Sequence, residues 1–515
     1  MKSSSRPVPG VAGGRELIVI GAFAAVKLVL HLATAAHYGY FRDELYFIAQ
    51  SEHLDWGYVD VAPMTAWLAR LMRMLLGDSL FAIHVLPALA GAATIVLTGL
   101  LARELGGRRF AVGLACLVVL LAPVFLVDDS LLGPGALERL LWVACTYCVV
   151  LAIRRQEPRY WLLFGMLAGL GLETKHSFLF FGFGLFTGLL LTNERNRFRE
   201  RHIWIAGAIA LLLFLPNLVW QIHHDFPTIE GLRNVQRQQK NVVFSPSGYV
   251  FQQILMLLPT SVLVWMAGLW FYFFHEHGQR YRLLGWTYLA VLLMMIGLKG
   301  KPYYMAPLYP MLLAGGAVWI DEIANRHRWR WLRPVSVALI LLPGVASAPG
   351  FLPVLPPEQA VTYMERMRLR PSKTEVGHMG ALPQYFGDRF GWPEMVEAVA
   401  QAYNALPPEE RAQTGILANN YGEAGAIDLL GRKYGLPKAT SPHQNYFYWG
   451  PGEQKRNYIV LQDEEEHLRE VCDAVEVVAV LDHPYAMQEE RRPVHLCRGL
   501  RLNLKERWPR MKHWN

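Results

Sequence analysis

The segment HYGYFRDELYFIAQSEHLDWGYVDVAPMTAWLARLMRMLLGD (residues 37–78) lies between two long apolar stretches. Its charged residues begin with Arg42, Asp43 and Glu44, directly after the first apolar stretch. A carboxylate at the edge of a bilayer costs free energy unless it is paired, hydrated or bound to a cation. Acidic residues also suit the first turn of a helix. The residue types alone therefore leave two interpretations open, a hydrated helix cap and a functional site.

The chain around this segment is unusually apolar. Of its 515 residues, 53% are hydrophobic and only 18% are charged, whereas soluble domains carry about 25% charged residues. Apolar stretches near the length of a membrane span recur from residue 16 to about residue 349. This composition excludes a disordered chain and argues against a cytosolic enzyme, so we expect a polytopic protein of the lipid bilayer.

About eleven transmembrane helices are expected, in an all-α bundle over residues 1–349. Their expected bounds are 16–36, 80–102, 110–127, 137–153, 160–172, 177–192, 203–222, 249–274, 283–298, 303–320 and 334–348. The first stretch is longer than the apolar core of a signal peptide, so we interpret it as an uncleaved anchor. Residues 37–79 then form the first loop, on the external side.

Arginine dominates every second connection between these helices. The Arg-rich connections are residues 103–109, 154–159, 193–202, 276–282 and 325–333. By the positive-inside rule they lie in the cytoplasm, and an odd number of spans places the C-terminus outside. The net charge of +8 is therefore largely a topology signal, and no nucleic-acid partner is expected.

Beyond residue 350 the composition becomes mixed and charged, after a Pro-rich linker at 349–358. Expected strands at 415–421, 457–463 and 475–483 alternate with helices, one of them at 422–435. This alternation predicts a periplasmic α/β domain over residues 350–515. Cys472 and Cys497 both fall in this domain. A disulfide between them is plausible in an oxidising compartment, and two buried thiols are the alternative.

The first loop continues into Met64–Leu76, which is apolar on one face and carries Arg70 and Arg73 on another. This pattern is typical of a helix that lies in the membrane interface with its guanidinium groups at headgroup height. Such a helix, next to a carboxylate in the same loop, suits the phosphate of a lipid.

Three further external segments carry charged or aromatic residues. Asp128 and Asp129 lie on a short loop and suit a cation or a hydroxyl, although solvated turn residues explain them equally well. Lys at the end of a span often extends to the interface, but several cations on the outer face also favour an anion site. The residues concerned are Lys175, His176, Lys299, Lys301, Tyr303 and Tyr304.

In the tail, Asn420 and Tyr421 are residue types that contact sugars well, and Glu423 follows them at an expected helix start. A helix cap is the alternative role for Glu423. The sequence holds no G-x-x-x-x-G-K-[ST], no strand followed by G-x-G-x-x-G and no H-E-x-x-H. Nucleotide-driven transport, dinucleotide chemistry and zincin proteolysis therefore lack their usual sequence support.

Several segments resemble the dolichyl-phosphate-mannose protein mannosyltransferase-like group (glycosyltransferase family 39), which includes the lipid A aminoarabinose transferases. The resemblance covers nearly the whole chain and is carried by YFRDELYFIAQSEHLDWGYVDVAP, TKHSFLFFGFGLF, KGKPYYMAPLYP and NYGEAGAIDLLGRKYGLP. It implies a GT-C fold, an outward-facing site and a polyprenyl-phosphate-linked sugar as donor. It also implies that Asp43 is the catalytic carboxylate with Glu44 beside it, and that Asp128 and Asp129 form the second acidic loop of the family. Here that loop reads DDSLLGPGALERLLW and departs from the family's plainer small-polar–acid pattern.

We therefore expect a hexosyl or pentosyl transferase of the bacterial inner membrane, acting on a lipid, glycan or protein hydroxyl with inversion. Asp43 would accept the proton of that hydroxyl. A divalent metal held by acids such as Asp43 and Asp128 is a possible further component. Expected contacts of the donor phosphate are Arg42, Arg70, Arg73, Lys175, His176, Lys299, Lys301, Tyr303 and Tyr304. Two alternatives are a transporter or flippase of lipid-linked glycans and a membrane-anchored sensor.

Overall fold

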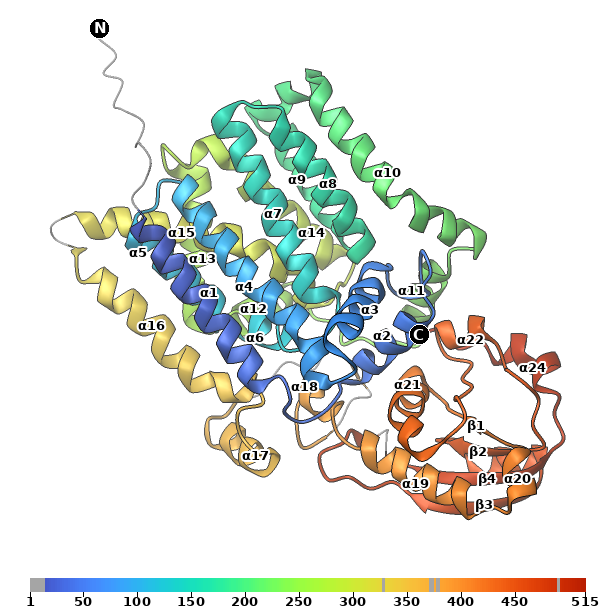
Figure 1. The fold of residues 1–515 in the computed structure, drawn as a ribbon. Coiled ribbons are helices and arrows are strands. Elements are labelled where there is room, and N and C mark those ends of the chain that lie inside the picture. Colours follow the sequence, from blue (N-terminus) through green and yellow to red (C-terminus); the bar gives the residue numbers. More distant parts are fainter. Residues whose placement is uncertain (1–13, 327–328, 370–374, 377–379, 489–490) are drawn as a thin grey trace, which may run out of the picture.

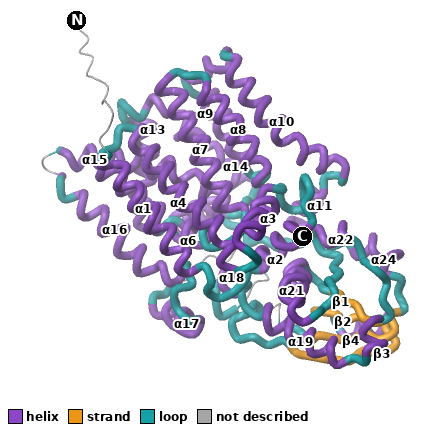
Figure 2. The backbone as a smooth tube through the Cα atoms, in the orientation of Figure 1, coloured by secondary structure: helices purple, strands orange, loops and turns teal. Residues whose placement is uncertain are grey.

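The structure is a computed structural model that describes residues 14–515, except 327–328, 370–374, 377–379 and 489–490. Residues 327–328 belong to the last of the Arg-rich connections. Long helices form a bundle, and a smaller domain is attached at one end of it (Figure 1). The four strands gather in this smaller domain (Figure 2).

Five helical segments of the described chain are long and apolar enough to cross a membrane. They are Arg15–Thr34, Leu80–Glu104, Pro134–Arg155, Arg201–His223 and Leu332–Gly350. A bent pair, Pro246–Met256 with Pro259–Phe274, makes a sixth if it counts as one span, and Arg109–Leu121 and Phe178–Leu190 are shorter apolar helices. The multi-pass character is confirmed, but the expected total of eleven spans is not.

Two of the expected continuous spans are broken at a proline. The stretch expected at 110–127 forms α5 (Arg109–Leu121) and α6 (Pro123–Asp128). Ala122 between them is extended, as the residue before a proline prefers. The stretch expected at 249–274 forms α12 (Pro246–Met256) and α13 (Val262–Phe274), which meet at 103° across Leu258, where φ is +83°, and Pro259.

The other helices of the bundle follow the apolar pattern closely. They are α1 (Arg15–Thr34), α4 (Leu80–Glu104), α7 (Pro134–Arg155), α8 (Arg159–Thr174), α9 (Phe178–Leu190), α10 (Arg201–His223), α14 (Arg282–Gly297), α15 (Tyr309–Asn325) and α16 (Leu332–Ser347). Two shorter elements, α11 (Pro227–Arg237) and η4 (Pro302–Leu308), lie between them in the chain. In the bundle α10 packs on α8, α15 on α13, α14 on α9 and α4 on α1.

Buried charges join α1, α6 and α7. The Lys27 ammonium lies 2.8 Å from the Asp129 carboxylate and donates to the Phe125 carbonyl oxygen at 3.1 Å. The Arg139 guanidinium bonds Asp129 as well and lies 3.1 Å from Asp128. Because the loss of one partner would leave a buried charge uncompensated, this network fixes the three helices relative to one another.

The first loop folds into two helices, α2 (Arg42–Glu52) and α3 (Met64–Leu76). The exposed face of α3 is apolar and includes Leu71, Met74 and Leu75, as an interfacial helix requires. Arg73 was expected to present its guanidinium to a lipid phosphate at headgroup height, but the structure pairs it with carboxylates instead. Its guanidinium is buried and ion-paired with Glu52 at 3.0 Å and with Asp78.

The smaller domain contains a mixed sheet in the order β1-β2-β4-β3. Strands β1 and β2 are parallel, and the other two pairings are antiparallel. The expected strand at 415–421 is shorter than predicted, and β4 was not predicted. The disulfide between Cys472 in β3 and Cys497 in β4 is present, as the first of the two expected alternatives. The strands are β1 (Thr414–Leu417), β2 (Asn457–Leu461), β3 (Cys472–Val480) and β4 (Pro493–Leu500). The helices are α17 (Pro357–Arg366), α18 (Gln384–Gly387), α19 (Trp392–Ala405), α20 (Pro408–Ala412), α21 (Tyr421–Leu430), α22 (Asn445–Trp449), α23 (Glu465–Val471) and α24 (Leu504–Met511), with η7 (Gly431–Tyr434) after α21.

Helix α2 belongs to the core of this smaller domain although it comes from the first loop. Leu45, Tyr46 and Ala49 pack among residues of α19, α21 and the sheet, and α2 and α21 meet where the bundle joins the smaller domain (Figure 1). On α21, a Cβ at Gly425 would lie 2.7 Å from the carbonyl oxygen of Leu45. The two helix backbones are therefore in close contact.

Ion pairs reinforce this contact. Glu52 at the end of α2 bonds Arg432 and lies 3.3 Å from the Lys438 ammonium, in addition to its pair with Arg73. Burial alone would raise the pKa of Glu52, but the Arg432 and Arg73 guanidiniums outweigh it and lower this pKa to about 2. The smaller domain is thus joined to the first loop by both apolar packing and charge.

The contact of Gly425 with α2 leads to a stability prediction. The free energy of unfolding of the G425A variant should fall by about 1–3 kcal/mol, because the added methyl group collides with the backbone of Leu45, which cannot move aside as a side chain could. The midpoint of thermal unfolding of the purified protein measures this effect. The matched control is G231A in α11, where a Cβ would meet nothing within 4 Å and the substitution should be neutral or slightly stabilising. Equal midpoints for the two variants would contradict the close contact.

Candidate active site

Asp43 lies in the first turn of α2, where the helix meets the smaller domain. Its Oδ1 accepts a hydrogen bond of 2.7 Å from the hydroxyl of Tyr421, the first residue of α21. Among the described residues no side chain bonds the second oxygen of Asp43. One oxygen of this carboxylate is therefore held by the smaller domain, and the other is available to a substrate.

A second carboxyl group, Asp60, lies close enough to Asp43 for their charges to interact. The Tyr46 hydroxyl donates to Asp60 Oδ1 at 3.2 Å. Asp60 is an exposed residue, but desolvation of its carboxyl by the surrounding protein and the nearby Asp43 charge raise its pKa to about 7, because both disfavour a second negative charge. Two carboxyl groups thus share the site.

Two cations, Arg42 and Lys240, lie near this pair, and a third, Lys301, lies near Lys240. Arg42 lies in α2 beside Asp43, with its guanidinium 3.8 Å from Asp388 and 5.9 Å from the ring centre of Tyr421. Lys240 follows α11, and burial lowers its pKa against the attraction of Glu375 and Asp43. Lys301 precedes η4 and lies 2.8 Å from Glu375. We call Arg42, Asp43, Asp60, Lys240 and Tyr421 the Asp43 group.

A second set, the Lys175 group, consists of Asp128, Glu138, Lys175, Tyr303 and Tyr304. The Lys175 ammonium is 3.2 Å from Glu138 and 4.7 Å from the ring centre of Tyr304. Burial opposes the charge of Lys175, but Glu138 and the two tyrosines outweigh it and raise the pKa of this ammonium. The set therefore holds a charged lysine over aromatic faces.

The Tyr303 ring lies between two lysines, 5.7 Å from the Lys175 ammonium and 6.0 Å from that of Lys301. Burial is the largest influence on the pKa values of Lys175 and Asp128, and it raises the pKa of Asp128 to about 6. Yet these side chains remain 22% and 30% exposed. Both side chains therefore still reach solvent although the surrounding protein desolvates them.

Two of the predicted acids lie in the scaffold instead. Glu44 is buried, caps α2 through the Phe41 amide at 2.8 Å, and bonds His84 and the Leu132 amide at 2.7 Å each. Helical geometry rotates adjacent residues by about 100°, so Glu44 points away from the side on which Asp43 lies. Asp129 is buried and neutralised by Lys27 and Arg139.

Four predicted phosphate contacts are also placed elsewhere. Arg73 is ion-paired in the first loop, as described above. His176 bonds the Asn217 side chain at 2.9 Å, which in turn donates to the carbonyl of Trp56. Arg70 and Lys299 are exposed, and within the described chain neither side chain makes a hydrogen bond or an ion pair.

Asn420 and Glu423, expected to bind a sugar, form the cap of α21. Asn420 Oδ1 accepts from the amides of Gly422 and Glu423, and Glu423 Oε2 accepts from the amide of Asn419 at 2.7 Å. Both side chains are thus used within the smaller domain. Tyr421 is the member of this predicted trio that reaches the first loop.

The described residues do not form a group of three His, Cys, Asp or Glu side chains that suits a metal ion. Asp43 and Asp128, the predicted ligands, belong to different sets, and Asp128 is paired with Arg139. The described residues thus do not make a metal site by themselves, and we derive no step through a metal.

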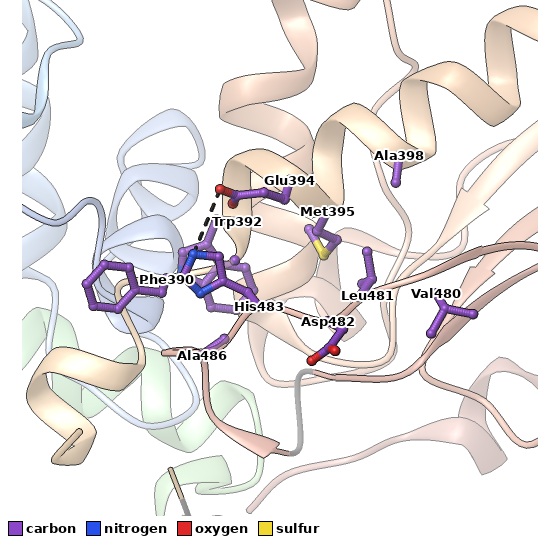
Figure 3. Close-up of a pocket in the computed structure, with 11 residues that line it drawn as sticks. Phe390, Trp392, Glu394, Met395, Ala398, Val480, Leu481, Asp482, His483 and Ala486 are labelled. Carbon is purple, nitrogen blue, oxygen red and sulfur yellow. Dashed lines mark ion pairs between the residues drawn. The ribbon is translucent and has the colours of Figure 1, made fainter. Parts of the chain in front are cut away.

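A separate cavity of about 170 Å³ lies in the smaller domain, between α19 and the end of β3 (Figure 3). Aromatic rings form part of its wall, with Phe390 stacked on His483 at 5.4 Å. His483 lies 4.0 Å from Glu394, as the dashed line in Figure 3 shows. The residues of the Asp43 group are not among its lining residues.

Sequence analysis missed Asp60 and Lys240. The signal for Asp60 was a second acid in the first loop, three residues before Pro63, and the signal for Lys240 was a lysine on an external connection. Neither signal distinguishes a site residue from a solvated one. The proximity of Lys240 to the first loop arises only in the tertiary fold.

Comparisons with known proteins agree with the predicted resemblance. A family model for dolichyl-phosphate-mannose-protein mannosyltransferase matches residues 60–220. The lipid A galacturonosyltransferase RgtD of Rhizobium johnstonii is 28% identical over 291 residues, which cover 54% of this chain and 59% of that relative. The expected resemblance to the mannosyltransferase-like group is confirmed.

Solved structures show the same fold. ArnT from Cupriavidus metallidurans, bound to undecaprenyl phosphate, is similar with a TM-score of 0.59 and 15% identity over 94% of this chain and 98% of that chain. The oligosaccharyltransferase of Archaeoglobus fulgidus is similar with a TM-score of 0.52 and 13% identity, over 83% of this chain and 64% of that chain. The helical GT-C architecture with a small C-terminal sheet is therefore confirmed.

The raised pKa of Asp60 can be measured directly. An infrared difference titration should show a protonated carboxyl that ionises as the pH rises through about 7, because burial and Asp43 disfavour its charge at lower pH. This signal should be absent from the D60N variant. The control is D55N, since Asp55 is an exposed acid of the same loop and its loss should leave the titration in place. A wild-type titration that D60N does not change would contradict the assignment.

Proposed function

We propose that this chain is a glycosyltransferase of the bacterial inner membrane that moves a sugar from a polyprenyl-phosphate donor to an extracytoplasmic hydroxyl. The observation that carries the proposal is the carboxylate of Asp43, which has only one of its two oxygens bonded by a described side chain and lies near the cations Arg42 and Lys240. A base that accepts a proton and cations that accept a phosphate are the two things this transfer requires. The fold shared with ArnT, which was solved with undecaprenyl phosphate, supports it.

Asp43 acts as the general base in this proposal. Its second oxygen accepts the proton of the acceptor hydroxyl while the hydroxyl oxygen bonds to the anomeric carbon of the sugar. The bond between that carbon and the phosphate oxygen breaks in the same step, and its electrons stay on the polyprenyl phosphate. A single displacement of this kind inverts the anomeric centre.

The cations of the site stabilise the phosphate that leaves. The charge of Lys240 interacts with that of Asp43, and the Arg42 guanidinium lies over the ring of Tyr421, which bonds Asp43. Lys175 and Lys301 flank the Tyr303 ring. Charge that develops on the phosphate in the transition state is stabilised by such fixed cations more than by water. We propose Arg42, Lys175, Lys240 and Lys301, with Tyr303 and Tyr304, as the donor-phosphate contacts.

The acceptor is proposed to be a saccharide hydroxyl of a membrane lipid. RgtD, to which this chain is similar, is named for action on lipid A. The exposed apolar face of α3 supports a site at the membrane surface, where a lipid acceptor lies. We place this site and the smaller domain on the periplasmic side, as the Arg-rich connections indicate.

The alternative of a transporter or flippase gains no support, because the relatives named above are transferases. The two functions predict different products. A transferase releases free polyprenyl phosphate from the donor, whereas a flippase leaves the lipid-linked sugar intact.

The D43N variant tests the base. Transfer from undecaprenyl-phosphate-linked hexuronic acid or pentose to lipid A should fall by about 10²–10⁴-fold, because the amide cannot accept the proton. The readout is release of undecaprenyl phosphate in a purified system. D55N, an exposed acid of the same loop, should retain the wild-type rate. Transfer by D43N at the wild-type rate would remove Asp43 as the base.

The K240M variant tests the phosphate site without any sugar. Binding of undecaprenyl phosphate in detergent should weaken about 10-fold, as expected for the loss of one charge-assisted contact. The matched control is K505M, which removes an exposed lysine of α24 and should leave the dissociation constant unchanged. If the two variants bound equally well, Lys240 would not contact the phosphate.

A further inference from the structure

The smaller domain reaches the first loop through the first residues of α21. A Cβ on Gly422 would lie 2.5 Å from the Cγ of Arg42, and one on Gly425 would lie 2.7 Å from the carbonyl of Leu45. The absence of side chains at these two positions lets α21 approach the first turn of α2. This approach brings Tyr421, the residue before Gly422, to Asp43.

The start of α21 is fixed by reciprocal capping. Asn420 accepts from the amides of Gly422 and Glu423, while Glu423 accepts from the amides of Asn419 and Asn420. A cap of this kind satisfies the free amides of the first turn and holds the backbone in one conformation. Tyr421 therefore leaves the backbone in a fixed direction.

The ring of Tyr421 is held on both faces. It stacks on Tyr46 of α2 at 4.7 Å and on His443 at 4.9 Å, with planes 29° and 25° apart. His443 in turn stacks on His513 at 4.8 Å. Because the stack leaves the phenol little freedom to swing, its hydroxyl is aimed at Asp43 rather than at solvent.

His443 is fixed as the neutral tautomer that this stack needs. Its Nδ1 lies 3.3 Å from the amide of Tyr421 and can only accept there, so its Nε2 carries the proton and donates to Asn515 Oδ1 at 3.1 Å. Burial, with the charges of His513, Lys240 and Arg42, lowers the pKa of His443 well below its usual value. A neutral ring against the phenol keeps a further charge away from Asp43.

We infer that Tyr421 is a positioning residue for Asp43, supplied by the smaller domain. Its hydroxyl occupies Oδ1 and turns the carboxylate so that Oδ2 faces the acceptor hydroxyl. A donated hydrogen bond also favours the ionised carboxylate, which is the form that acts as a base. The smaller domain is thus part of the catalytic apparatus, and transfer depends on its contact with α2. This inference rests on the proposed function, with Asp43 as the base.

The Y421F variant tests it, since this change removes the hydroxyl and keeps the ring stack. The turnover number should fall about 10- to 100-fold, as expected for the loss of a hydrogen bond to a charged group. The Michaelis constant of the donor should stay unchanged, so the loss should appear in turnover alone, as expected for a group that acts through the base. Binding of undecaprenyl phosphate should stay unchanged, which shows that the fold and the phosphate site remain intact.

The matched control is Y446F. Tyr446 is buried in the same domain, and its hydroxyl donates to a different carboxylate, Asp428, at 3.0 Å. Loss of the Tyr446 hydroxyl removes a tyrosine–carboxylate hydrogen bond of the same kind and should leave turnover as in the wild type. Equal losses of turnover in Y446F and Y421F would mean that the effect is one of stability, and would overturn the inference.

A double mutant separates this inference from the function on which it rests. In the D43N background, Y421F should cause no further loss, because the two residues act through one bond. A D43N variant with full activity would overturn the proposed base itself. An inactive D43N together with a wild-type turnover number in Y421F would overturn only the role of Tyr421.

Discussion

Helix α2 is buried on two sides, and the position of the candidate base depends on both. Leu45 and Tyr46 pack into the smaller domain, whereas Phe47 and Ile48 pack into a separate cluster with α3 and α4. A helix of three turns that fills two cores cannot rotate or slide without opening one of them. Asp43, in its first turn, is therefore held at a fixed place between the membrane bundle and the smaller domain.

Electrostatics divide the charged residues into a scaffold and a site. In the scaffold, opposite charges are matched, as for Glu44 with His84 and Lys27 with Asp129. In the candidate site, desolvation by the surrounding protein and the charge of Asp43 raise the pKa of Asp60 to about 7. Like charges at close range destabilise a fold, and such shifted pairs cluster at functional sites. This contrast separates the candidate site from the scaffold more clearly than the residue types do.

The sequence predicted the coarse architecture well and the site only in part. Long apolar stretches such as α1, α4 and α10 were recognisable because hydropathy over 20 residues is a strong signal. Asp43 was identified by its position and by the family resemblance. Glu44 was assigned to the site because a sequence motif does not show that adjacent residues of a helix point in different directions. Lys240 was missed since its proximity to Asp43 arises from long-range packing, and β4 because its residues PVHLCRGL lack a strand pattern.

The two-sided burial of α2 also bears on the biogenesis of the protein. The ribosome delivers α2 early, and the segments that cover Leu45 and Tyr46 are synthesised among the last. While the intervening helices are synthesised and inserted, one face of α2 therefore lacks the residues that it packs against in the folded protein. Tyr421 meets Asp43 only when the tail has been synthesised and has folded, so a nascent or truncated chain lacks this hydrogen bond to the proposed base.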